Sequence, residues 1–93
     1  MKFLYCRSPL CQDAVKLQRQ DRTCKCGKCS GKLNDDMRSA TITGRYAEVL
    51  EMNDTSLLQA LKSPDLEPTV FGIGPVVKAF IWPHNADMIT RKL

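Results

Sequence analysis

All five cysteines of this 93-residue chain lie between positions 6 and 29, in two clusters separated by twelve residues. The first cluster is Cys6 and Cys11, and the second is Cys24, Cys26 and Cys29. A chain that folds back between two such clusters presents two pairs of thiolates to one metal ion. The odd number of cysteines, and an N-terminus that does not read as a signal peptide, disfavour disulfides. We therefore predict a structural zinc site in the first third of the chain.

Five cysteines compete for the four ligand positions of a structural zinc site. Cys26-Gly-Lys-Cys29 has the two-residue spacing of a zinc knuckle, whereas Cys24 to Cys29 repeats the four-residue spacing of Cys6 to Cys11. Spacing favours Cys6 and Cys11 plus two of the other three cysteines, and it does not separate these three.

Other chemistry is not indicated by the sequence. A catalytic zinc site keeps an open position and mixes in histidine or carboxylate, but the single histidine, His84, follows a strand-ending proline and is expected in a solvated loop. Asp35-Asp36 is expected in a solvated turn. Gly72-Ile-Gly74-Pro75 lacks the lysine and the following helix of a phosphate-binding loop, so it predicts a turn. We therefore expect a protein that is not an enzyme.

The formal net charge of +4 is unevenly distributed. Residues 1–34 hold eight Lys and Arg against two Asp, whereas residues 35–93 hold six against eight acidic residues. Four thiolates and one divalent ion together carry a charge of about −2, so much of this basicity compensates the metal site. The remainder could contact phosphates. The candidate ligand or partner contacts are Arg7, Arg22, Lys25, Lys28 and Trp82.

The segment from Cys6 to Gly31 resembles a zinc-ribbon or zinc-knuckle module, with a wider first spacing and an extra cysteine. The whole chain, with its runs Arg22 to Gly31 and Ala79 to Pro83, resembles short uncharacterised proteins of phages and bacteria. This resemblance implies a cytoplasmic location, in the bacterial host cell if the protein is phage-encoded. For a phage protein it implies a partner that is a host protein or a small nucleotide-type signal.

The predicted fold is a single domain over residues 1–93, mainly β (small α+β), with an antiparallel sheet, one short helix and an N-terminal four-cysteine zinc knuckle. A zinc-ribbon-like portion spans 1–34 and a β-rich portion spans 35–93. Leucines at helical spacing before Pro64 predict the helix over 55–62, with Asp54 or Thr55 as its cap. Alternation and β-branched content predict strands over 1–5, 14–20, 38–43, 45–52, 76–82 and 86–90, the last at a sheet edge.

The apolar run 76–82 predicts a central, covered strand, with Phe80 in the core and Trp82 exposed. No apolar run approaches the roughly 20 residues of a membrane helix, so we expect a cytoplasmic protein without a membrane partner. We rank first a non-enzymatic, zinc-stabilised binding protein whose partner is a host protein or a small molecule. The alternative is a nucleic-acid-binding zinc ribbon. Either is compatible with a homo-oligomer.

Overall fold

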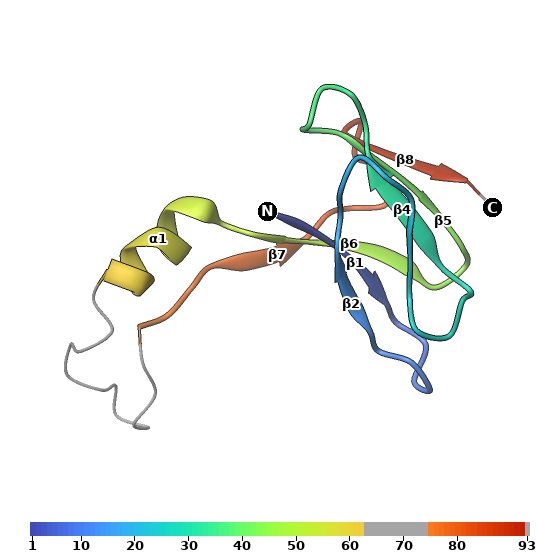
Figure 1. The fold of residues 1–93 in the computed structure, drawn as a ribbon, viewed down its shortest axis with the longest axis horizontal. Helices are drawn as coiled ribbons and strands as arrows, with labels where there is room; N and C mark the ends of the chain where they lie inside the picture. Colours follow the sequence, from blue (N-terminus) through green and yellow to red (C-terminus); the bar gives the residue numbers. More distant parts are fainter. Residues whose placement is uncertain (63–74, 93) are drawn as a thin grey trace.

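The computed structural model describes residues 1–62 and 75–92, which form two four-stranded sheets and one helix (Figure 1). The first sheet has the spatial order β2 (Ala14–Lys16), β1 (Lys2–Cys6), β6 (Ala47–Met52) and β7 (Ala79–Ile81). The second sheet has the order β3 (Arg22–Thr23), β4 (Ser30–Leu33), β5 (Ala40–Thr43) and β8 (Ile89–Lys92). The helix α1 (Asp54–Lys62) lies between β6 and β7 in the sequence. The predicted mainly β architecture with one short helix is confirmed.

Strand pairing joins the first third of the chain to the rest in both sheets. β1 pairs antiparallel with β6, so that Cys6 lies opposite Ala47. β4 pairs antiparallel with β5, with Ser30 opposite Thr43. The other pairs are antiparallel as well, except that β8 runs parallel to β5. The predicted last edge strand therefore exists, shifted toward the C-terminus relative to 86–90.

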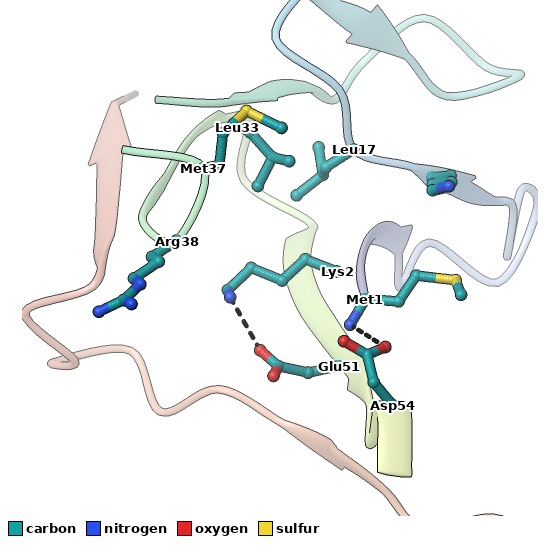
Figure 2. Close-up of a pocket in the computed structure, with 9 residues that line it drawn as sticks. Met1, Lys2, Leu17, Leu33, Met37, Arg38, Glu51 and Asp54 are labelled. Atoms are coloured by element: carbon teal, nitrogen blue, oxygen red, sulfur yellow. Dashed lines mark hydrogen bonds and ion pairs between the residues drawn. The ribbon is translucent and has the colours of Figure 1, made fainter. Parts of the chain in front are cut away.

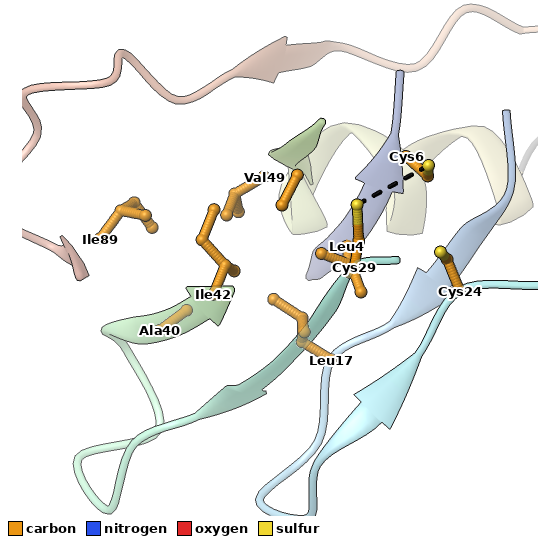
Figure 3. Packing of buried hydrophobic residues seen from close by; sticks show 10 residues of the cluster. Leu4, Cys6, Leu17, Cys24, Cys29, Ala40, Ile42, Val49 and Ile89 are labelled. Atoms are coloured by element: carbon orange, nitrogen blue, oxygen red, sulfur yellow. Dashed lines mark hydrogen bonds between the residues drawn. The ribbon is translucent and has the colours of Figure 1, made fainter. Parts of the chain in front are cut away.

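The core forms from alternate residues of strands in both sheets, because successive side chains of a strand point to opposite faces. Leu4 and Val49 of the first sheet pack with Ile42 and Ile89 of the second (Figure 3). Three cysteines, Cys6, Cys24 and Cys29, belong to the same buried cluster, as does Leu17. The cysteine-rich segment is therefore continuous with the hydrophobic core.

The helix α1 begins at Asp54, one residue before the predicted start, and it is capped by Asn53 rather than by Asp54 or Thr55. The Asn53 Oδ1 atom accepts a hydrogen bond of 2.8 Å from the Ser56 amide, which satisfies a free donor of the first turn. None of the helix residues is buried. Figure 1 shows α1 lying apart from the two sheets, beyond the end of the β6–β7 pair.

The prediction of a central, covered strand over 76–82 is wrong. The observed strand β7 covers only Ala79–Ile81, it lies at the edge of its sheet among the described residues, and all three of its residues are exposed. Phe80 is 47% exposed, whereas Trp82 is half-buried against the core, which reverses the predicted roles of these two aromatic residues. An apolar run does not show how many neighbours its strand has, because strand neighbours come from elsewhere in the chain. The turn predicted over 72–75 falls largely outside the described residues.

Trp82 is held by a polar contact as well as by packing. Its Nε1 donates a hydrogen bond of 2.8 Å to Glu51, which also forms an ion pair of 3.0 Å with Lys2. Burial opposes the ionisation of Glu51, but the Lys2 ammonium and the Trp82 indole outweigh it and hold the pKa of this carboxyl below its ordinary value. This contact fixes β6 against the segment that follows β7.

Candidate metal site

Four of the five cysteine thiols meet in the structure. The Sγ atoms of Cys6, Cys11, Cys24 and Cys26 all lie within 4.8 Å of one another. The Cys26 sulfur is 3.8 Å from that of Cys6 and 3.3 Å from that of Cys24. A tetrahedral metal with metal–sulfur bonds of about 2.3 Å places its sulfur ligands about 3.8 Å apart. The thiols therefore have nearly the spacing that one tetrahedral ion requires.

The first cysteine loop follows β1 and is closed by backbone hydrogen bonds. The Cys11 and Gln12 amides both donate to the Ser8 carbonyl, at 3.0 and 3.1 Å, and Gln12 has a positive φ of 53°. The Cys6 amide donates to the Asp13 carbonyl at 3.0 Å. This tight turn brings Cys11 back beside Cys6, as Ser8 and Pro9 in the sequence indicate.

The second cysteine loop joins β3 to β4 and is closed in the same way. The Cys24 amide donates to the Cys29 carbonyl at 3.0 Å, and the Gly27 amide donates to the Cys24 carbonyl at 3.0 Å. Gly27 has a φ of 79°, a conformation that glycine adopts at little cost. The Asp13 carboxylate accepts a 2.9 Å hydrogen bond from the Lys25 amide and so ties the two loops together. Nothing in the sequence pattern marks Asp13 for this role.

Cys29 lies on the inner side of the second loop. It is 1% exposed, and its thiol donates a hydrogen bond to the Cys6 sulfur over 3.7 Å (Figure 3). It is not among the four cysteines whose sulfurs all meet. The spacing of the sequence leaves Cys24, Cys26 and Cys29 equivalent, and the structure brings only the first two into the group of four.

A third loop packs against the second one at Gly44, between β5 and β6. Gly44 has a φ of 122°, and a Cβ atom there would lie 2.5 Å from the Lys28 carbonyl oxygen and 3.2 Å from the Cys29 sulfur. Only glycine allows this close approach. The bend at Gly44 therefore places the following residues, Arg45 and Tyr46, beside the cysteine loops.

The protonation of the thiols is set by burial and by their proximity. Burial raises the pKa of Cys6 to about 11, against a backbone hydrogen bond from Ser8 that favours its thiolate. Burial also opposes the ionisation of Cys24, but hydrogen bonds from the Cys26 thiol and the Cys29 backbone lower the pKa of Cys24 to about 6. The Lys28 backbone favours the Cys26 thiolate, but the Cys24 sulfur outweighs it and raises the pKa of Cys26 to about 12. Thiols so close together ionise together only when a cation compensates them.

The predicted contact residues do not form one site. Arg7, Lys25 and Lys28 are exposed on the two cysteine loops, and Arg22 is exposed on β3. Trp82 instead packs beside Lys2 and Glu51 in the first sheet. The four cations are therefore exposed, as expected for contact residues. Trp82 instead contributes to the packing of the fold.

His84 belongs to a charged cluster that sequence reasoning missed. Its Nε2 contacts both carboxylate oxygens of Glu48, a residue only 7% exposed. Arg91 donates to Glu48 at 3.1 Å and to the Ala47 carbonyl at 2.8 Å. His84 is exposed in a turn, as the sequence predicts, but its ring also contacts this nearly buried carboxylate. Glu48 and His84 lie 36 residues apart, so no local pattern could have revealed the pair.

A pocket of about 310 Å³ lies on another part of the surface (Figure 2). Its apolar part is formed by Met1, Leu17, Leu33 and Met37, and the ion pair between Lys2 and Glu51 is part of its lining. Lys16 and Arg38 also line it. Neither of these two cations has an ion-pair partner among residues 1–62 and 75–92.

No protein-family model matches the chain, and no curated protein and no solved structure matches it either. Function must therefore be argued from the residues themselves. In the described part of the chain, no helix has the length and apolar character needed to cross a membrane.

Proposed function

We propose that the protein binds one Zn²⁺ ion through Cys6, Cys11, Cys24 and Cys26, and that this ion is structural. The observation that carries the proposal is the meeting of four sulfurs from two separate loops within 4.8 Å. Four thiolates make a closed tetrahedral set, which is typical of structural zinc and leaves no position for a reacting water.

The position of the four cysteines supports a role in stability. Cys6 and Cys11 flank the loop that leaves β1 of the first sheet, and Cys24 and Cys26 follow β3 of the second. An ion bound to all four would cross-link the two sheets. Among the described residues the buried apolar core has ten members, of which three are cysteines and none is aromatic. A core this small gains substantially from a metal, because binding free energy adds to folding free energy.

Native mass spectrometry of the purified chain tests the zinc count, and circular dichroism during chelation tests its structural role. We expect one zinc per chain and loss of the β-sheet signal when zinc is removed. A chain that stays folded and metal-free would contradict the proposal.

Cobalt substitution tests the ligand set. We expect Cys11→Ser to lose the absorption bands of a four-thiolate Co²⁺ site, whereas Cys29→Ala keeps them, because the Cys29 sulfur lies outside the group of four. The opposite result would make Cys29 a ligand in place of Cys11.

As a second candidate function, we propose that the protein is a non-enzymatic binding protein for a small anionic molecule of nucleotide type. The pocket of Figure 2 supports this, because it combines an apolar part with Lys16 and Arg38. The two carboxylates of its lining, Glu51 and Asp54, are paired with the Lys2 and N-terminal ammonium groups. The resemblance to phage and bacterial proteins supports a cytoplasmic setting and, as another partner, a host protein. A thermal-shift screen of nucleotides tests the pocket: a stabilising nucleotide should lose its effect in Lys16→Ala. Stabilisation that persists in this variant would contradict it.

A further inference from the structure

The two cysteine loops and the Gly44 turn gather four exposed cations on one part of the surface. We propose that this surface, formed by Arg7, Lys25, Lys28, Arg45 and the ring of Tyr46, binds the phosphate backbone of single-stranded nucleic acid. The inference rests on the proposed zinc site only because the ion would fix the loops that carry these residues.

Two of the cations are held on one aromatic ring. The guanidinium carbons of Arg7 and Arg45 lie 5.5 and 5.7 Å from the centre of the Tyr46 ring. The Arg7 side chain also reaches the Arg45 carbonyl oxygen at 3.4 Å, and its amide donates to the Tyr46 carbonyl at 2.9 Å. Tyr46 is itself half-buried against the core. The two guanidinium groups are therefore positioned before any partner binds, which reduces the entropy lost on binding.

The charges of this surface are available to a partner. Among residues 1–62 and 75–92, neither Arg7 nor Arg45 forms an ion pair, and the same holds for Lys25 and Lys28. Other exposed cations differ, since Arg19 pairs with Asp35. A guanidinium held over a ring retains N–H donors for a phosphate, although one Arg7 N–H group already faces the Arg45 carbonyl oxygen.

The loops that carry these cations are in direct contact. The Lys28 carbonyl oxygen lies against Gly44, and Cys26 meets Cys6 across the proposed metal site. The zinc–thiolate centre and the nearby Asp13 together carry a charge of about −3. With the four cations, the net charge of this region is therefore only about +1. Attraction at long range is therefore small, and affinity must come from direct phosphate contacts, which makes it sensitive to salt.

The shape of the surface favours a single strand. Its cations come from three tight loops rather than from a helix or ribbon that could enter a groove of duplex DNA. Proteins bind single strands by pairing cations with phosphates and by stacking bases on aromatic or guanidinium planes. Arg7, Arg45 and Tyr46 provide both kinds of contact within one small area.

Fluorescence anisotropy with a labelled oligothymidylate and the zinc-loaded protein tests the proposal. We expect Arg7→Ala/Arg45→Ala to bind about tenfold or more weakly, because two charge-assisted contacts are lost. Its plot of log affinity against log salt should be shallower by about 1.4, since each single-strand phosphate contact contributes about 0.7. The matched control is Lys62→Ala/Lys78→Ala, which removes two exposed positive charges near α1 and should change neither quantity. Arg7→Lys/Arg45→Lys should fall between, because it keeps charge but loses stacking.

Three results would overturn the proposal. The first is that Arg7→Ala/Arg45→Ala and Lys62→Ala/Lys78→Ala bind the oligonucleotide equally well. The others are that duplex DNA binds as tightly as the oligothymidylate, or that polyglutamate competes as effectively as unlabelled oligothymidylate. The last would assign the surface to an acidic protein instead. The zinc count of the same samples separates the two proposals. Binding that depends on Arg7 and Arg45 in a metal-free protein would refute the zinc site alone, and zinc without oligonucleotide binding would refute this surface alone.

Discussion

Replacement of Gly44 by alanine should destabilise the zinc-loaded protein by about 2–6 kcal/mol. Its φ of 122° lies beyond the left-handed well that other residues reach, which costs about 1–3 kcal/mol. The new Cβ would also lie 2.5 Å from the Lys28 carbonyl oxygen, a backbone atom of the second cysteine loop. Relieving such an overlap lowers the free energy of unfolding by about 1–3 kcal/mol more.

Gly27→Ala is the matched control because it separates backbone strain from overlap. Gly27 also has a positive φ, of 79°, but a Cβ there would meet nothing within 4 Å. Its replacement should cost only about 1–2 kcal/mol. A domain of this size has a total stability of about 5–14 kcal/mol, so the Gly44 variant should lose a large share of it.

Urea unfolding of the two variants, followed by the fluorescence of the single tryptophan, measures both losses in the presence of zinc. The Gly44 variant should also bind zinc more weakly, because Cys29 and the second loop must shift. Equal losses in the two variants, or a larger loss for Gly27→Ala, would refute the close packing of the Gly44 turn on the cysteine loops.

Three further predictions follow from the packing and the charges. Leu4→Ala should lower the free energy of unfolding by about 2–5 kcal/mol in urea, because Leu4 is fully buried, whereas Leu10→Ala at a 97% exposed position should change it by less than about 0.5 kcal/mol. Glu48→Gln should cost about 1–3 kcal/mol, because it removes the partner of the partly buried Arg91; an unchanged urea midpoint would show that the pair contributes nothing. The stability that the Glu51 carboxylate contributes is complete above about pH 4.3 and is lost as the pH falls through its lower folded-state pKa. The difference in unfolding free energy between wild type and Glu51→Gln should therefore narrow in acid. A difference that grows in acid would contradict the pKa shift.

Several elements could be predicted because their signals are local. Alternation of apolar residues gave strands close to β1, β5 and β6, and leucines at helical spacing gave α1 within one residue of its start. The edge position of β7 could not be predicted, because an apolar run carries no information on the neighbours of its strand. The parallel pairing of β8 with β5 was equally invisible, since it joins segments almost fifty residues apart.

The sequence by itself determined that the cysteines would meet, because two clusters twelve residues apart can be joined by a short chain reversal. It also determined the basic character of their loops. Only the tertiary structure decided that Cys24 and Cys26, rather than Cys29, join Cys6 and Cys11 in the group of four.

The tertiary structure alone also brought Arg45 and Tyr46 to the cysteine loops and His84 to Glu48. The physical reason is the range of the interactions. Turns and cysteine spacing depend on a few neighbouring dihedral angles, whereas contacts between distant residues depend on how both sheets pack around one shared core.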